Sequence, residues 1–159
     1  MRRVFVLSLI VLCLFSCSAC GRAGADRKSL CPLPFSATVE GTRGELRFCA
    51  EIFASAKERT IRYTAPETLA GLTVTETDGR IAVRQGDFFA QDAPDAKGFL
   101  APLELLLSPA ELSSVEEQNG ERILTYTDGT KLICEKDGTP RAVIGAEIFY
   151  TISDFTKLP

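Results

Sequence analysis

The side chains that could carry out catalysis are few and poorly placed in this chain of 159 residues. The sequence contains no histidine, which excludes nucleophilic catalysis of the Ser-His or Cys-His type. Carboxylates occur as pairs at Glu116-Glu117 and at Asp92 with Asp95. Neighbouring residues of a strand point to opposite faces, so the first pair cannot share a substrate, and the second pair reads as part of an exposed loop. We therefore expect no catalytic residues and no enzymatic activity.

The sequence indicates no site for a phosphate, a metal ion or a cofactor. The segment Gly41-Thr42-Arg43-Gly44 has two glycines but is not followed by a lysine or a helix, and it reads as a turn between strands. Cys31, Cys49 and Cys134 are widely separated and form no Cys-x-x-Cys pair. We expect no metal and no cofactor, and the spacing does not fix the disulfide state of these cysteines.

The N-terminus has the three parts of a secretory signal. It begins with Arg2 and Arg3, continues with an apolar run over 4–15, and ends in small residues over 16–21. The apolar run has about a dozen residues, which is short of the roughly 20 that a membrane-spanning helix needs. The segment resembles the lipobox of bacterial lipoproteins, in which small residues precede a cysteine that is diacylated and becomes the mature N-terminus. An ordinary cleaved signal with chance cysteines is the alternative.

Two cysteines match the position of the acylated residue. Cys20 follows two small residues and precedes Gly21, but Cys17 occupies a position where an aliphatic residue is usual. Cys17 as the anchor would have Leu14 at that aliphatic position, with the bulky Phe15 after it. We expect Cys20 to carry the lipid, with Cys17 as the alternative.

These signals divide the chain into a lipoprotein signal peptide over 1–19, a tether over 20–33 and a single domain over 34–159. Removal of the signal would leave 16 basic and 21 acidic residues, a net charge of −5, which makes nucleic acid an unsuitable partner. An acidic body is not attracted to anionic headgroups either, so attachment to the membrane must come from the N-terminal diacylglyceryl cysteine. The expected location is the extracytoplasmic face of the cell membrane.

The domain reads as a series of antiparallel hairpins. Turn dipeptides, such as Asp78-Gly79 and Asn119-Gly120, separate short runs with strand character, and they suit type I′ turns because both central residues need a positive φ. The pattern predicts a meander of eleven strands, over 35–40, 45–53, 60–64, 72–77, 80–84, 87–90, 114–118, 122–127, 131–135, 141–144 and 147–155.

One face of the predicted sheet is apolar and must be covered. The cover predicted by the sequence is a helix over 99–107, in which Pro102 suits the first turn. A capping box at 108–111 predicts a second short helical turn. The fold class is therefore mainly β with a minor α part (α+β): a large curved antiparallel sheet that forms an incomplete barrel and is covered by a short central helix.

Two segments resemble the lipoprotein-carrier proteins of the LolA-like superfamily. They are Arg62 to Pro66, with an arginine, an aromatic residue and a proline, and Leu72 to Ile81, with a strand followed by Asp-Gly. The resemblance implies a half-barrel that binds acyl chains or partner proteins. A lipidated chain is more similar to the membrane-anchored members, including clostridial lipoproteins linked to the spore envelope, than to the soluble shuttles.

Two functions follow from this reading. The first is the binding of a lipid, an acyl chain or a lipoprotein in an apolar groove between sheet and helix. The second is a docking or regulatory role for an enzyme of the cell envelope or spore envelope, with the groove filled by the protein's own side chains. The predicted groove and lid residues are Phe99, Leu103, Leu106 and Leu107 of the helix, and Phe48 and Ile52 of the sheet.

Overall fold

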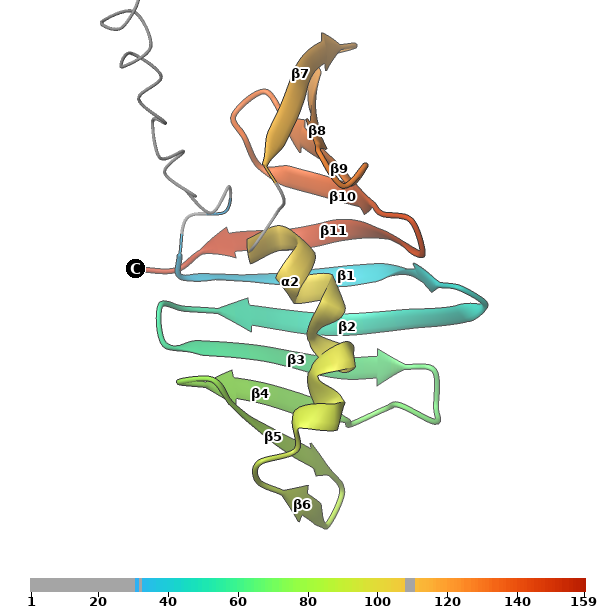
Figure 1. Ribbon diagram of the computed structural model, residues 1–159, viewed down its shortest axis with the longest axis vertical. Coiled ribbons are helices and arrows are strands. Elements are labelled where there is room, and N and C mark those ends of the chain that lie inside the picture. The colour runs from blue at the N-terminus through green and yellow to red at the C-terminus, as the bar shows by residue number, and fades with distance from the viewer. Residues whose placement is uncertain (1–30, 32, 108–110) are drawn as a thin grey trace, which may run out of the picture.

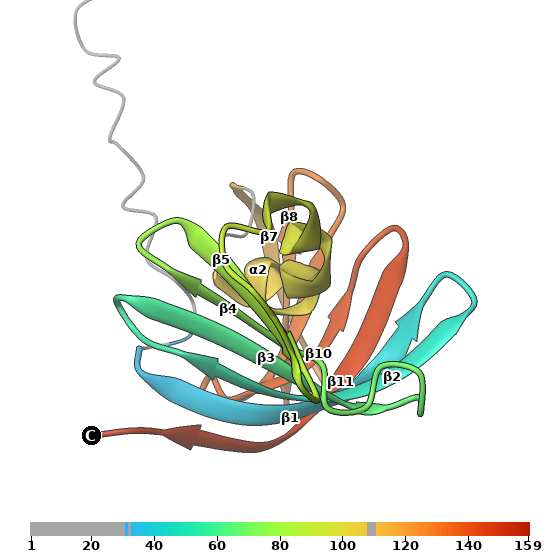
Figure 2. The ribbon, with the colours of Figure 1, turned by 90° about the horizontal axis from the view of Figure 1, so that it is seen from below.

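A computed structural model describes residues 31, 33–107 and 111–159 of the chain. In this part, eleven strands form one antiparallel sheet, which curves around a single helical segment and does not close on itself (Figures 1 and 2). The predicted fold class, an incomplete barrel covered by a short helix, is confirmed. Within the described residues, no helix is both long enough and apolar enough to cross a membrane.

The strands lie close to their predicted positions, with ends that move by a few residues. They are β1 (Phe35–Arg43), β2 (Leu46–Ala54), β3 (Glu58–Ala65), β4 (Thr73–Thr77), β5 (Arg80–Gln85), β6 (Phe88–Ala90), β7 (Leu112–Gln118), β8 (Glu121–Tyr126), β9 (Lys131–Glu135), β10 (Pro140–Ile144) and β11 (Ile148–Lys157).

The sheet consists of two meanders that meet at its centre. Its order is β6-β5-β4-β3-β2-β1-β11-β10-β9-β8-β7, so β1 pairs with β11 although the two strands lie at opposite ends of the domain sequence. This order leaves β6 and β7 at opposite edges of the sheet. The chain between them must therefore cross the whole face, and this crossing segment is the helix.

The helical segment is longer than predicted and has two parts. The 3₁₀-helix η2 (Pro94–Leu100) leads directly into the α-helix α2 (Ala101–Leu107). Pro94 opens η2 at a position where its missing N–H costs no hydrogen bond, and Asp95 lies in the first turn. Asp95 is exposed, as predicted, but it lies in this helical turn and not in a loop, so that part of the prediction was wrong. The predicted helical turn at 108–111 falls largely on residues outside the described part of the chain.

The tight turns follow the prediction at two places and differ from it at two others. Both central residues have positive φ at Asp78-Gly79 and at Asn119-Gly120, as a type I′ turn requires. In the loops after β8 and β9, only the glycine has a positive φ, and the carboxylate of the preceding aspartate accepts a hydrogen bond from the backbone N–H two residues on. This side-chain bond stabilises a longer turn, which is why these Asp-Gly pairs do not form two-residue hairpins.

Gly41 lies inside β1, not in the predicted turn at 41–44. A Cβ atom at this position would collide with the Phe149 carbonyl oxygen and would lie 2.5 Å from the Tyr150 Cα. Only a residue without a side chain lets β1 and β11 approach this closely, so Gly41 is required by the junction of the two meanders. Gly44, with a φ of +58°, forms the turn itself.

Candidate functional site

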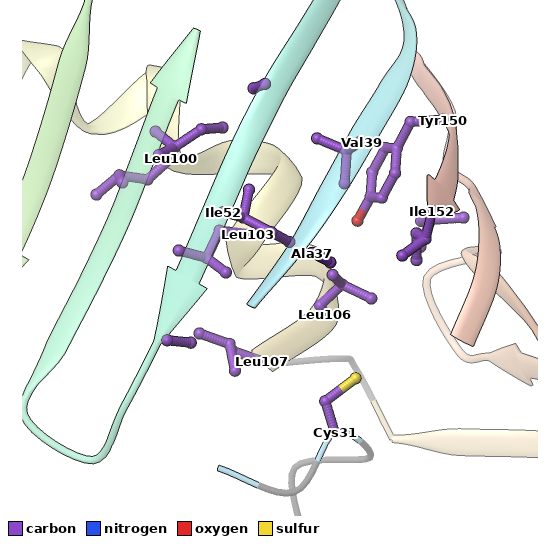
Figure 3. Packing of buried hydrophobic residues seen from close by; sticks show 14 of the residues in the cluster. Cys31, Ala37, Val39, Ile52, Leu100, Leu103, Leu106, Leu107, Tyr150 and Ile152 are labelled. Atoms are coloured by element: carbon purple, nitrogen blue, oxygen red, sulfur yellow. The ribbon is translucent and has the colours of Figure 1, made fainter. Parts of the chain in front are cut away.

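The concave face of the sheet and the helix that crosses it form the predicted groove and lid. Leu103 and Leu106 of α2 are 0% exposed, and with Leu107 they point onto apolar residues of the central strands, such as Ile52 and Ala37 (Figure 3). Strand alternation supplies those partners, because Phe48 and Ile52 fall on the face opposite Glu51. The structure brings all six predicted groove and lid residues into one apolar cluster, with Phe99 partly buried at its margin and Phe48, Ile52, Leu103, Leu106 and Leu107 buried.

Three side chains of the sheet hold the helical segment by its backbone carbonyl oxygens. The Tyr63 hydroxyl donates to the Phe99 oxygen at 2.7 Å, and the buried Tyr150 hydroxyl donates to the Pro102 oxygen. The Arg43 guanidinium donates to the Gly98 oxygen at 2.6 Å. These bonds fix the position of the helix across the sheet, which apolar contacts alone do not specify.

Aromatic rings line the groove beneath these bonds. Phe48 lies between two tyrosines, with its ring centroid 6.1 Å from that of Tyr63 and 6.4 Å from that of Tyr150. Phe99 meets the Tyr63 ring edge-on at 6.0 Å. These separations are those of edge-to-face and tilted aromatic contacts, so the rings pack directly against one another between sheet and helix.

Burial keeps the two tyrosines in the hydrogen-donating form. It raises the pKa of Tyr63 to about 12, an effect that the nearby Arg43 cation partly offsets. Burial, with a smaller effect from Cys31, also raises the pKa of Tyr150 well above its usual value. A phenolate cannot donate a hydrogen bond, so the raised pKa values preserve both bonds to the helix even near pH 10, where an exposed tyrosine begins to lose its proton.

The cysteines and carboxylates of the described residues form no chemical centre. Burial raises the pKa of Cys31 to about 12 and that of Cys134 to about 11, so both remain protonated thiols and poor nucleophiles. No group of three or more metal-ligating side chains occurs in the part of the chain that the structure describes. Glu116 and Glu117 are both exposed on β7, consistent with solvated charges.

The comparisons with known proteins give a fold and no family. No protein-family model matches the chain, and no curated protein matches it. Among solved structures, the chain is similar to an uncharacterized conserved protein from Thermus thermophilus, with a TM-score of 0.50 and 14% identity over 79% of this chain and 80% of that chain. It is also similar to a LolA superfamily protein from Nitrosomonas europaea, with a TM-score of 0.39 and 8% identity over 79% and 86% of the two chains. At these identities the first likeness shows the fold alone, and the second, at its lower TM-score, carries no argument.

Sequence reasoning identified the leucines of the lid but missed the polar groups that hold it. Tyr63 and Tyr150 carried a usable signal, because each alternates with polar residues on a strand and so falls on the buried face. Arg43 gave no such signal, since its contact with Gly98 joins residues 55 positions apart. The predicted lipidation residues, Cys20 and its alternative Cys17, lie outside the described residues.

Proposed function

We propose that this chain is a membrane-anchored lipoprotein whose non-catalytic domain binds a partner protein of the cell envelope. The observation that carries the proposal is the filled concave face, in which Leu103 and Leu106 of the crossing helix are fully buried against the sheet. A groove occupied by the protein's own side chains leaves the sheet edges and the outer surface for binding. The proposal therefore favours docking over the carriage of a lipid.

The strand best suited to receive a partner is β7, at one edge of the sheet. Every one of its seven residues is exposed, and its apolar side chains Leu112 and Val115 are each 46% exposed. Edge strands carry unpaired backbone donors and acceptors, and an extended segment of another protein can add to them as a further strand. Soluble proteins usually shield such edges, so a long edge with apolar side chains that no described residue covers supports a docking role.

The anchor in this proposal is the diacylated Cys20. Two acyl chains hold a protein stably at a membrane, whereas a single chain gives marginal binding. The mature chain has a net charge of −5, which supplies no attraction to anionic lipids, so the acylated N-terminus has to provide the attachment. The partner would then lie within reach of the tether over 20–33, on the extracytoplasmic side of the membrane.

Photo-crosslinking in the native envelope tests the proposal. A photoreactive amino acid at Val115 of β7 should capture one reproducible partner, while the same group at Lys57, an exposed residue in the turn between β2 and β3, should not. A Val115→Asp variant should release that partner from co-purification, because a carboxylate is costly to bury in an interface. Identical products from both positions, or none from either, would contradict the proposal.

The second candidate function is the binding of an acyl chain in place of the helix. It is favoured by the broad apolar face under α2, a helix of only seven residues. Its leucines and one side-chain hydrogen bond, from Tyr150 to the Pro102 oxygen, hold α2 in place, and two further bonds hold the preceding η2. A swing of this segment away from the sheet would expose that face to a lipid. Organic extraction of the purified protein followed by mass spectrometry separates the candidates, because a carrier yields a stoichiometric lipid and a docking protein does not.

A further inference from the structure

The face of the sheet opposite the helix carries an open cleft of about 440 Å³. Its volume lies within the range of roughly 300–1,000 Å³ that is typical of small-molecule sites. Seven polar or charged side chains and one aromatic side chain from β1 to β4 and β11 line it, together with Ala37 and Ile52: Ser36, Thr38, Glu51, Phe53, Thr60, Arg62, Thr73 and Asp154. The proposed docking function does not use this cleft.

Strand register places these side chains in two parallel rows across the sheet. In the first row, Thr73, Arg62, Glu51 and Thr38 are successive cross-strand neighbours on β4, β3, β2 and β1. In the second row, two residues further along each strand, the neighbours are Thr75, Thr60, Phe53 and Ser36. Neighbouring strands are about 4.8 Å apart, so hydroxyl groups recur across the face at the spacing of the sheet, with one phenyl ring among them.

A β-bulge brings an additional carboxylate to the cleft. Thr38 pairs with Ser153 and Ser36 pairs with Thr156, so two residues of β11 lie opposite the single residue Ala37. Asp154, the first of the two, has a φ of +51° and lines the cleft. Bulges commonly redirect a side chain toward a binding site, and here the bulge directs a carboxylate to the outer face.

Several of these polar groups have no partner within the described residues. Neither the hydroxyls of Ser36 and Thr38 nor the carboxylate of Asp154 forms a hydrogen bond or an ion pair with the described part of the protein. The Arg62 guanidinium and the Glu51 carboxylate lie 3.8 Å apart at the surface, which places a donor group beside an acceptor group. The hydroxyls of Thr60 and Thr73 already have hydrogen-bond partners within the protein. The hydroxyls of Ser36 and Thr38, together with the carboxylate and guanidinium groups of the cleft, are the groups offered to a ligand.

We infer that this outer-face cleft binds a short neutral oligosaccharide. Sugar hydroxyls both donate and accept, so they match a surface of hydroxyls, carboxylates and one guanidinium, and the apolar face of a pyranose ring can cover Phe53. The lining has two carboxylates and one guanidinium, a balance that disfavours acidic ligands. An acyl chain is disfavoured because it would bury the charged groups of Glu51, Arg62 and Asp154 without supplying hydrogen-bond partners for them.

Saturation-transfer NMR and calorimetry on the protein as purified from its membrane test this inference. The protein is solubilised in deuterated dodecylphosphocholine, which has no sugar headgroup, and titrated with N,N′-diacetylchitobiose, cellobiose and maltose. Trialanine serves as the competing peptide ligand. We expect saturable binding of at least one disaccharide at millimolar concentration or below, and none of trialanine.

Variants that replace a carboxylate of the cleft by a neutral amide test whether the sugar binds there. Asp154→Asn keeps a residue that tolerates the left-handed backbone, and Glu51→Gln keeps the size of its side chain. Each should weaken sugar binding about tenfold, as expected for the loss of a charge-assisted hydrogen bond. The matched control is Glu40→Gln, which makes the same change of charge on β1 outside the cleft and should bind as the parent protein does.

Each opposite outcome overturns the inference. The cleft is not a sugar site if no disaccharide gives saturable binding, or if trialanine binds and the disaccharides do not. Equal affinities of Asp154→Asn, Glu51→Gln and the parent protein would place the sugar elsewhere. If Glu40→Gln lowers the affinity for the disaccharide as much as the cleft variants do, the effect comes from the overall charge of the protein and not from the cleft. None of these results depends on the partner protein, so this inference and the docking proposal can fail separately.

Discussion

Replacement of Leu103 by alanine should destabilise the domain strongly. The Leu103 side chain is 0% exposed and lies in the core cluster between helix and sheet. Its loss removes the transfer free energy of the deleted carbons and leaves a cavity, because a helix held at three carbonyl groups cannot collapse fully into the space. Together these terms lower the free energy of unfolding by about 2–5 kcal/mol, which corresponds to a decrease in Tm of roughly 10 °C.

The measurement is urea or thermal unfolding of the full chain, followed by circular dichroism. Leu105→Ala is the matched control, because Leu105 is a leucine of the same helix that is only partly buried. Leu105→Ala should lower the free energy of unfolding by about 1 kcal/mol or less. If Leu103→Ala costs no more than Leu105→Ala, the helix does not pack on the sheet as described, and the argument that the groove is filled fails with it.

The remaining predictions concern the tyrosines and one glycine. Tyr150→Phe should cost about 1 kcal/mol of unfolding free energy through loss of its hydrogen bond, whereas Tyr126→Phe should be neutral or stabilising, because the buried Tyr126 hydroxyl has no partner among the described residues. All three tyrosines of the chain have raised pKa values, so absorbance at 295 nm should show no phenolate near pH 10. Because the folded state favours the neutral phenols, the contribution of these tyrosines to the free energy of unfolding is complete below pH 10 and is lost as the pH rises through about 12. Titration of all three tyrosines near pH 10 would contradict this prediction. Gly41→Ala should prevent stable folding by forcing β1 and β11 apart, while Gly98→Ala, whose Cβ would have no heavy atom closer than 3.9 Å, should be tolerated in the same unfolding assay.

The strands and the lid could be predicted because their signals are local. Alternation of apolar and polar residues along β2 and positive-φ turn residues such as Asn119-Gly120 act within a few positions of the chain. The pairing of β1 with β11 joins residues that are far apart in the sequence. The sequence feature that relates to this pairing is Gly41, and a glycine at this position is equally typical of a turn. The extension of the helix back to Pro94 was missed because short 3₁₀ turns have little periodicity.

The candidate sites were harder to predict than the fold. The apolar groove residues followed from spacing, but whether the groove is open or filled depends on the packing of side chains in three dimensions. The outer-face cleft depends on the register of five strands and on a bulge at Asp154, and neither can be read from a single sequence. Threonines on an exposed face look like ordinary strand surface until the register places them beside Glu51 and Arg62.

Native mass spectrometry of the protein extracted from its own membrane tests the central claim most directly. The claim is that the protein is anchored by an acylated cysteine and that its helix fills the groove. We expect a mass that equals residues 20–159 plus the covalent lipid of Cys20, with no further lipid bound and a partner protein retained under gentle ionisation. A mass without the covalent lipid would contradict the anchor. A stoichiometric non-covalent lipid, lost on organic extraction, would contradict the filled groove and favour the carrier function.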